Sequence, residues 1–235
     1  MPRCIVCGKT VESWLPHPLV EHRSEFMVTM RAVGSDLSIF QCPSCGCNDR
    51  DRHLWLFMHT VGLLEQINRF RVLHIAPEQH LELLISRLEP VEYVRGDLFP
   101  KSPQHLKLDI ENLAFEAERF ELIICNHVLE HVADPVKAVS ELYRCLAPRG
   151  ILIAQTPYSP YLKKTLEVNE PVSPEFAKLF YGQEDHVRLF GADIAELFVQ
   201  AGFVGAPLPS ESVLGPLGPL EYGFNALEPF FVFNK

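Results

Sequence analysis

Four cysteines in two close pairs are the residues whose types and spacing specify chemistry most directly. Cys4 and Cys7 lie in CIVCG, and Cys42 and Cys45 lie in CPSCGC. Two residues between the sulfurs let one tight turn direct both thiolates at the same ion, and the glycine that follows relieves the backbone of that turn. The two pairs predict a structural zinc ion bound by four thiolates. Cys47 is interpreted as a bystander because Cys45 already fills the second position of its turn.

The segment around these pairs, residues 1–53, is predicted to be a zinc ribbon. The pairs are separated by 34 residues, and the stretches FMVTM and LSIF within that insert are expected to supply short ribbon strands. The alternative is a small core of reduced cysteines, which is weak because so short a segment with little apolar content is hard to stabilise without a metal. Cys125 and Cys145 lie in apolar or amphipathic stretches and are predicted to be core residues.

Strand-like and helix-like stretches alternate from Phe70 onward. The apolar stretches RVLHIA, VEYVRGD, LKLDI, FELIICNHV and GILIAQTP are separated by amphipathic helical patterns such as EQHLELLISRLE and PVKAVSELYRCLA. This alternation predicts an α/β domain over residues 54–235 with a parallel, doubly wound sheet. Ligands of such sheets bind at the carboxyl ends of the strands, so polar residues at those ends are candidate site residues.

Four polar residues end three of these stretches. Asp97 can accept hydrogen bonds from two ribose hydroxyls, although a turn-forming role is an equal alternative. Asp109 can accept a hydrogen bond from an exocyclic adenine amine, or it can cap the helical turn that follows. Asn126 and His127 end the fourth stretch. Together these residues favour a nucleoside-bearing ligand.

The turn after the first predicted strand, Ala76-Pro77-Glu78, contains no glycine. A dinucleotide loop needs glycines and helix amides that face a pyrophosphate, whereas Glu78 sets a carboxylate there. An NAD enzyme is therefore disfavoured, while a cationic cofactor without phosphate gains from the carboxylate. The alternative is that Glu78 only stabilises the amino end of the helix it begins.

The stretch LDIENLAFEAERFELIICNHVLEHVADPVKAVSELYRCLAPRGILIAQTP resembles the central third of class I S-adenosylmethionine-dependent methyltransferases. NHVLEHVADP followed by ELYRCLAPRGIL is its most specific part. The resemblance covers about residues 55–235, and the predicted zinc ribbon before it is similar to that of a zinc-ribbon subset of such enzymes. It implies a Rossmann-like, mostly parallel sheet whose final strand, FFVFN, is antiparallel.

The resemblance also implies roles for individual residues. Asp97 with Leu98 would hold the ribose of S-adenosylmethionine, and Asp109 with Ile110 would hold the adenine. Asn126 and His127 would flank the sulfonium. The first loop departs from the usual pattern, because His74 stands at the usual acidic position and Ala76, Pro77 and Glu78 replace the glycine-rich turn. A similar LHIAPE turn occurs in some zinc-ribbon relatives, so these three are also assigned to the cofactor, with Glu78 toward its ammonium. The cofactor residues so assigned are Ala76, Pro77, Glu78, Asp97, Leu98, Asp109, Ile110, Asn126 and His127.

Methyl transfer to a hydroxyl or amine needs an aligned acceptor and a general base. His186, in YGQEDHVRLF, is the first candidate for the base and His127 is the second. Tyr158, Tyr181 and Arg188 are candidate substrate contacts. Packing under a lid is the alternative for the tyrosines, and a structural hydrogen bond is an equal alternative for Arg188. The proline-rich and aromatic stretch after the fifth predicted strand is expected to form that lid.

Charge and hydropathy restrict the partners. The 235 residues carry a net charge of -9, all of it in residues 54–235, which disfavours a broad grip on nucleic acid. There is no apolar run of the roughly 18 residues that a membrane span requires and no signal-peptide pattern, so a cytoplasmic protein without membrane contact is expected. The leading hypothesis is O- or N-methyl transfer to a small-molecule acceptor. The alternatives are an inactive methyltransferase-like scaffold and an RNA base methyltransferase, and the oligomeric state stays open.

Overall fold

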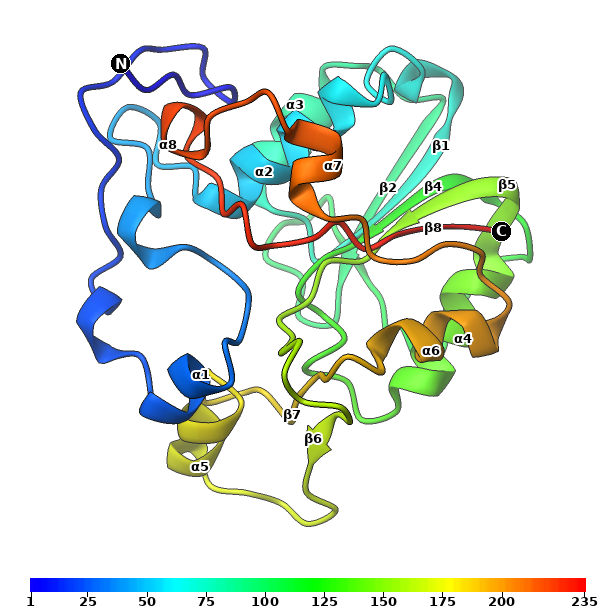
Figure 1. The fold of residues 1–235 in the computed structure, drawn as a ribbon. Coiled ribbons are helices and arrows are strands. Elements are labelled where there is room, and N and C mark those ends of the chain that lie inside the picture. Colours follow the sequence, from blue (N-terminus) through cyan, green and yellow to red (C-terminus); the bar gives the residue numbers. More distant parts are fainter.

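A six-stranded sheet forms the centre of the molecule (Figure 1). The computed structural model describes the backbone of residues 1–235 and every side chain except that of His22. The strand order is β3-β2-β1-β4-β5-β8. All neighbouring strands are parallel except β8, which runs antiparallel to β5. The predicted Rossmann-like α/β sheet with an antiparallel final strand is confirmed.

The central strands are apolar because helices cover both faces of the sheet. Every residue of β1 after its first is buried, and β4 is buried at five of its six positions. The strand bounds are β1 Arg71–Ile75, β2 Glu92–Asp97, β3 Leu106–Lys107, β4 Phe120–Cys125, β5 Leu146–Ile153 and β8 Val232–Asn234. Two short strands outside this sheet, β6 Leu166–Glu167 and β7 Arg188–Leu189, pair with each other.

Two layers of helices cover the sheet. One core cluster joins it to α4 (Pro135–Cys145) and α6 (Ile194–Ala201), and the other joins it to α2 (Asp49–Thr60), α3 (Gln79–Ser86) and α7 (Ser210–Leu214). Helix α4 begins where the Asp134 carboxylate accepts a hydrogen bond from the Lys137 amide, which satisfies one of the free amides at a helix start. Two further short helical segments are η3 Ile67–Arg69 and α8 Pro219–Tyr222.

The insert between the cysteine pairs forms helices instead of the predicted ribbon strands. FMVTM lies in α1 (Glu25–Thr29), and LSIF contains η2 (Leu37–Ile39), while η1 spans Val20–His22. The Ser24 hydroxyl accepts from the Met27 amide and the Asp36 carboxylate accepts from the Ser38 amide. These side chains favour helix starts over strands. The strand prediction for this insert was therefore wrong.

Helix α1 packs against α5 (Pro174–Phe180), in the stretch predicted to be a lid. Met27 and Ala177 belong to one buried cluster, and the Ser24 hydroxyl donates to the Leu179 carbonyl at 2.6 Å. Figure 1 shows this pair of helices away from the sheet, beyond the carboxyl ends of the strands. The two segments, about 150 residues apart in the chain, therefore cover the sheet edge together.

Arg52 joins the cysteine-rich segment to the rest of the molecule. Helix α2 begins at Asp49, where Asn48 and Asp51 form a capping box, and it ends at Thr60. It therefore runs across the predicted boundary between the two domains, at residues 53 and 54, and this boundary stays a prediction. The Arg52 side chain is fully buried and donates to the carbonyls of Gly223 at 2.7 Å and Cys47 at 2.9 Å. Its guanidinium also lies 4.1 Å from the Trp14 ring.

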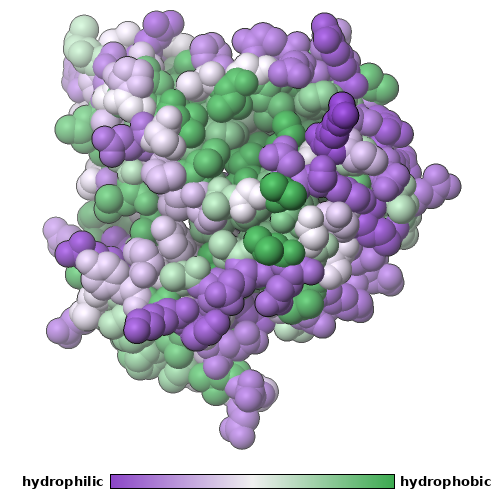
Figure 2. Space-filling model, turned by 45° about the vertical axis from the view of Figure 1, so that its right-hand side comes forward, coloured by the Kyte–Doolittle hydropathy of each residue, from purple (hydrophilic) through white to green (hydrophobic). Residues whose placement is uncertain are grey.

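The surface is mixed in character. Figure 2 shows hydrophilic residues around the edge of the face that it displays and hydrophobic residues near its centre. Among the residues that the structure describes, no helix is both long and apolar enough to cross a membrane.

We expect Arg52→Lys to lower the free energy of unfolding by about 2–5 kcal/mol, because one ammonium cannot reach carbonyls on three segments and a buried charge is left poorly bonded. Urea unfolding followed by circular dichroism measures this. Arg69→Lys, at an exposed position, is the matched control and should change stability by less than about 0.5 kcal/mol. Equal stability of the two variants would contradict the role given to Arg52.

Candidate active site

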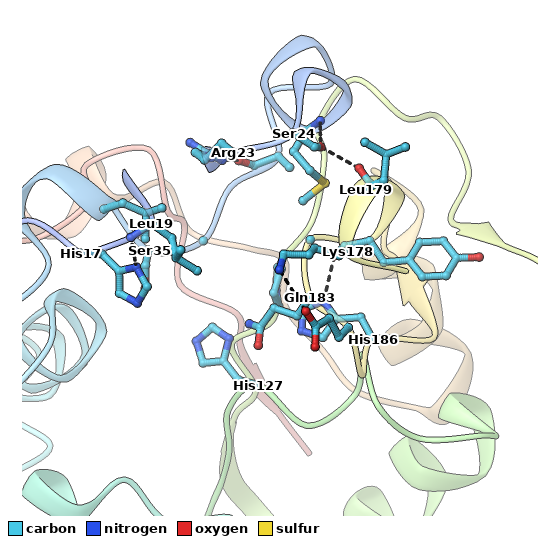
Figure 3. A pocket seen from close by; sticks show the side chains of 18 of the residues that line it. His17, Leu19, Arg23, Ser24, Ser35, His127, Lys178, Leu179, Gln183 and His186 are labelled. Carbon is cyan, nitrogen blue, oxygen red and sulfur yellow. Dashed lines mark hydrogen bonds and ion pairs between the residues drawn. The ribbon is translucent and has the colours of Figure 1, made fainter. Parts of the chain in front are cut away.

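A cleft of about 950 Å³ lies between the insert of the cysteine-rich segment, the α5 region and the sheet edge. Figure 3 shows its side chains, with Arg23 and Ser24 on one side and His127 and His186 on the other. His127 and His186 were both predicted to face the reaction, and the structure brings them to the same cleft. Because three remote segments form the cleft, its shape depends on the packing of α1 against α5.

A second, smaller hollow adjoins the cleft at the carboxyl edge of β1 and β4. Its lining residues are Arg50, His53, Leu54, Glu78, Asn126, His127, Gln155 and Glu228. Arg50 and His127 line both spaces. These two side chains therefore stand at the junction between the large cleft and the edge where the cofactor was predicted.

Glu78 is held by residues at the ends of two neighbouring strands. One carboxylate oxygen lies 2.8 Å from His74 Nε2 and the other accepts from Asn126 Nδ2 at 3.1 Å. Burial alone would raise the pKa of Glu78, but hydrogen bonding and the charge of His74 lower it, so the group is a carboxylate at neutral pH. Although Glu78 precedes α3, its side chain makes no capping hydrogen bond to any described residue. The helix-capping alternative therefore has no hydrogen bond to support it.

Two non-glycine residues at this edge have left-handed backbone. Ala76 has φ +47° and its amide donates to the Gly96 carbonyl at 2.7 Å, and His127 has φ +53° with its amide donating to the Gln155 carbonyl at 2.6 Å. Such conformations cost roughly 1 kcal/mol or more outside glycine and gather at functional sites. The turn after β1 thus has the backbone that a glycine-rich loop would adopt, although its sequence contains none.

Asp97 and Asp109 each stabilise a local turn with one carboxylate oxygen. Asp97 accepts from the Phe99 amide and Asp109 from the Glu111 amide, both at 2.9 Å. In each case the second oxygen has no hydrogen bond to a described residue and can accept one from a ligand. Leu98 is 48% exposed, whereas Ile110 is buried. The turn-forming role and the predicted ligand role are compatible, and the latter stays a prediction.

Behind His127 lies a buried carboxylate, Glu130. One of its oxygens is 3.5 Å from His127 Nδ1, and the other accepts from the Thr156 hydroxyl at 3.0 Å. Burial would raise the pKa of Glu130, but the nearby His127 ring and the charges of His127 and His186 lower it to about 2. Glu130 was not identified from the sequence, although its spacing of three residues from His127 in HVLEH was a signal.

His186 lines the cleft from the loop after α5. It is 3% exposed, and its Nδ1 lies 2.8 Å from the Tyr181 carbonyl. Burial lowers its pKa, so the ring is neutral at pH 7. Its Nε2 makes no hydrogen bond within the described part of the chain. A neutral ring with a free nitrogen can accept a proton or coordinate an ion.

The other predicted substrate contacts are occupied by the protein. The Arg188 guanidinium is 1% exposed and binds both oxygens of Glu167 and the carbonyls of Leu129 and Ala133. Arg188 therefore has the structural role that the sequence analysis gave as an equal alternative to a substrate contact. Tyr181 lines the cleft, but its hydroxyl accepts from the Val168 amide. Tyr158 pairs with Val33 through backbone hydrogen bonds, and it is not one of the described residues that line the cleft.

Five thiols gather in the cysteine-rich segment. The ligand atoms of Cys4, Cys42, Cys45 and Cys47 lie within 4.8 Å of one another. Hydrogen bonding from the Cys47 thiol lowers the pKa of Cys4. Gly8 and Gly46 have φ +74° and +81°, as expected for glycines that complete metal-binding turns. These four thiols fit a zinc ion. Cys47, which the sequence analysis interpreted as a bystander, is one of the four, whereas the predicted ligand Cys7 is not.

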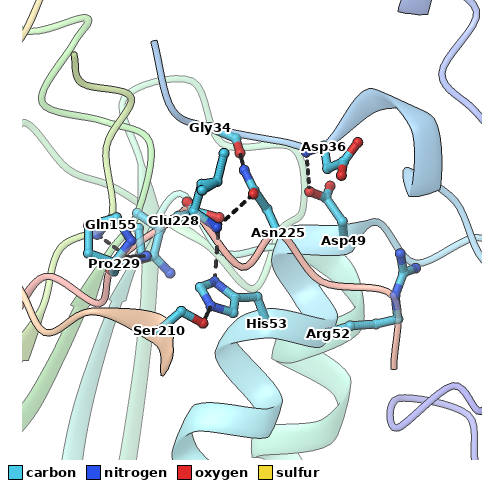
Figure 4. A network of polar contacts seen from close by, with 12 residues as sticks. Gly34, Asp36, Asp49, Arg52, His53, Gln155, Ser210, Asn225, Glu228 and Pro229 are labelled. Atoms are coloured by element: carbon cyan, nitrogen blue, oxygen red, sulfur yellow. Dashed lines mark hydrogen bonds and ion pairs between the residues drawn. The ribbon is translucent and has the colours of Figure 1, made fainter. Parts of the chain in front are cut away.

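A polar network connects α2, the chain end and the insert beneath the hollow (Figure 4). His53 Nδ1 lies 3.4 Å from Glu228 and its Nε2 lies 3.1 Å from the Ser210 hydroxyl. Asp49 accepts from the Asp36 amide at 2.7 Å. Burial, and then the charge of Glu228, raise the pKa of Asp49 to about 7. His53 and Glu228 were missed because no sequence pattern joins positions so far apart.

The comparisons with known proteins agree with this geometry. A family profile described as a methyltransferase domain matches residues 84–154. Among solved structures, an S-adenosylmethionine-dependent methyltransferase from Mesorhizobium loti superposes with a TM-score of 0.50 at 12% identity, covering 75% of this chain and 96% of that one. The fold is that of a class I methyltransferase. A second such enzyme, from Archaeoglobus fulgidus, has a TM-score of 0.49 at 12% identity and covers 78% and 94%. The comparison with curated proteins found no match.

The charged groups at the edge of this methyltransferase fold suit the charges of S-adenosylmethionine, and the hollow among them has a volume of about 10 Å³. Glu78 supplies a fixed negative charge, Asp97 and Asp109 have free carboxylate oxygens, and the Nε of Arg50 is buried without a hydrogen-bond partner among the described residues. Arg50 can bind a negatively charged group and Glu78 a positively charged one, so the pair suits a ligand that carries both an ammonium and a carboxylate.

We expect Cys42→Ser to release zinc, because three thiolates hold the ion less tightly than four. Metal analysis of the purified full chain measures this. Cys125→Ser, a buried thiol remote from the cluster, is the control and should keep full zinc content. Zinc loss in Cys7→Ser or in Cys47→Ser identifies the fourth ligand, and full zinc in Cys42→Ser would contradict the site.

We expect Asp49→Asn to alter the pH dependence of stability. The folded pKa of about 7 lies above the ordinary value of 3.8, so the native state binds more protons between these values and stability falls as pH rises through 7. The uncharged side chain of the variant does not ionise, so stability no longer falls with pH at this position. Its carbonyl oxygen can still accept a hydrogen bond from the backbone amide of Asp36. Relative to the natural chain, the variant should gain about 1–3 kcal/mol between pH 4 and pH 8. Parallel stability curves over that range would show that Asp49 is ionised in the folded protein.

Proposed function

We propose that this protein is an S-adenosylmethionine-dependent methyltransferase that modifies a small molecule by O- or N-methyl transfer. The observation that carries the proposal is the junction at His127. There a hollow with a fixed carboxylate, Glu78, opens beside a cleft of about 950 Å³. A methyl donor at the strand ends and an acceptor in the cleft would meet at this point.

The methionine end of the cofactor carries an ammonium and a carboxylate. Glu78 would bind the ammonium, since His74 and Asn126 hold its carboxylate in place. Arg50, on the same hollow, would bind the carboxylate through its guanidinium. Asp97 would bind the ribose hydroxyls with its free oxygen, and Asp109 with Ile110 would bind the adenine. Charge-assisted hydrogen bonds of this kind are the strong ones.

S-adenosylmethionine supplies an electrophilic methyl group on a sulfonium. The protein's residues align the acceptor and remove its proton. Glu130, a carboxylate behind His127, favours a proton on His127 Nδ1 and leaves Nε2 able to accept one from a hydroxyl or amine. His186, neutral and on the wall of the same cleft, is the second candidate for this role.

The cleft supports a small acceptor. Its volume is in the usual range for small-molecule sites, and its wall combines apolar side chains such as Met27 and Phe40 with the charged Arg23 and Lys178. The net charge of -9 disfavours RNA. The seven free cysteines suit a reducing compartment, so we place the protein in the cytoplasm.

We expect Glu78→Gln to weaken binding of S-adenosylhomocysteine by roughly ten- to hundredfold, or about 1.5–3 kcal/mol, because the ammonium loses its charged partner. Isothermal titration calorimetry measures the affinity. Glu116→Gln, at an exposed position, is the control and should bind as the natural chain does. A lowered melting temperature with unchanged affinity would assign Glu78 a structural role only.

The same titration tests the proposal as a whole. If the natural chain bound neither S-adenosylhomocysteine nor S-adenosylmethionine, the enzymatic function would be rejected in favour of an inactive scaffold. If it binds, radiolabelled S-adenosylmethionine and pools of hydroxyl- and amine-bearing small molecules identify the acceptor class.

A further inference from the structure

Three potential metal ligands meet beside the cleft, far in the sequence from the cysteine cluster. One ligand atom from each of Glu130, His131 and His186 lies within 4.8 Å of the other two. Glu130 and His186 are 1% and 3% exposed. His186 also lines the cleft, so the cluster adjoins the space in which the acceptor would bind through this one residue.

Hydrogen bonds to carbonyl groups set the tautomers of both histidines. His186 Nδ1 lies 2.8 Å from the Tyr181 carbonyl and His131 Nδ1 lies 3.1 Å from the Asp185 carbonyl. A carbonyl oxygen can only accept, so each Nδ1 carries the proton and each Nε2 keeps its lone pair. Metal-binding histidines have this arrangement, in which the second nitrogen donates to a carbonyl that orients the ring.

The buried histidine has an unsatisfied nitrogen. His186 Nε2 makes no hydrogen bond to any part of the described chain, and the rings of His131 and His186 are 4.8 Å apart and nearly perpendicular. Buried polar atoms without partners are rare, and binding of an ion is one of the common reasons for them. An ion bound to Nε2 would satisfy it and would balance the charge of Glu130.

We infer that Glu130, His131 and His186 bind a divalent first-row transition-metal ion beside the cleft. Two imidazoles and one carboxylate suit zinc, manganese, iron or cobalt better than magnesium or calcium. A tetrahedral ion with bonds of about 2.0–2.1 Å holds its ligand atoms roughly 3.4 Å apart, so the three residues need to close by at most about 1.4 Å. One oxygen of Glu130 can coordinate while the carboxylate still accepts from Thr156.

Three protein ligands leave at least one coordination position of the ion unfilled, and His186 connects the site to the cleft. An acceptor with a hydroxyl or carboxylate oxygen can occupy such a position, and the ion then lowers the pKa of a bound hydroxyl. This consequence rests on the proposed methyl transfer, whereas binding of the ion does not. The site therefore favours acceptors with an oxygen ligand close to the atom that receives the methyl group.

Equilibrium dialysis of the zinc-loaded full chain against Co²⁺, followed by elemental analysis, tests the inference. We expect one Co²⁺ per chain with the cysteine-bound zinc retained. Substituting the exposed ligand, His131→Ala, should weaken Co²⁺ binding on the order of ten- to hundredfold, and Glu130→Gln should do the same. His59→Ala, at another exposed histidine outside the cluster, is the matched control and should bind as the natural chain does.

The inference is overturned if the natural chain binds no Co²⁺ beyond exchange with its zinc, or if His131→Ala and Glu130→Gln bind it equally well. Calorimetry with S-adenosylhomocysteine on the same samples separates the two proposals. Cofactor binding without Co²⁺ binding rejects only the metal site. Co²⁺ binding that is lost in His131→Ala, without cofactor binding, supports the metal site and rejects only the methyltransferase function.

Discussion

The carboxylate of Glu78, held between the ends of β1 and β4, is the constraint on which the candidate site depends. His74 lies in β1, Asn126 directly follows the neighbouring parallel strand β4, and Glu78 bonds to both. This bridge fixes the turn after β1 against the loop after β4, where His127 lies. Because Asn126 also accepts from the Gln155 amide, the loop after β5 joins the same network. A charged group thus does two things at once, since it orders the sheet edge and supplies negative charge for a cationic ligand.

The second constraint is the way in which the amino-terminal segment encloses the edge. Arg52 anchors the segment through carbonyls on three parts of the chain, and α1 packs on α5. In Figure 1 the amino terminus lies at one end of this segment, and α1, whose Met27 lines the cleft, lies at the other. A metal ion in the cluster would therefore stabilise the base of a segment whose other end forms the cleft wall. This arrangement explains how a short, weakly apolar segment can contribute to a binding site.

The candidate base and the candidate metal ligands come from one short stretch and one distant loop. His127, Glu130 and His131 follow β4 directly, and His186 comes from the loop after α5. Glu130 connects both groups, since it lies 3.5 Å from His127 Nδ1 and its ligand atom lies within 4.8 Å of those of His131 and His186. A single buried carboxylate therefore connects the position of the candidate base to that of the candidate ion.

The sequence by itself determined the parallel sheet and its strand ends, because those depend on local hydrophobic periodicity and on short-range turn residues. The antiparallel final strand was implied by the resemblance to class I methyltransferases. It also indicated the cofactor edge, since Glu78, Asp97 and Asn126 each directly follow or end an apolar strand. Only the tertiary structure decided that FMVTM and LSIF form helices on the cleft wall. It also decided that the Arg188 guanidinium binds Glu167 and backbone carbonyls of the protein itself, and that Cys47 lies among the clustered thiols. It alone joined Arg50 and Glu130 to the site. These outcomes depend on contacts between residues far apart in the chain, for which a local pattern contains no signal.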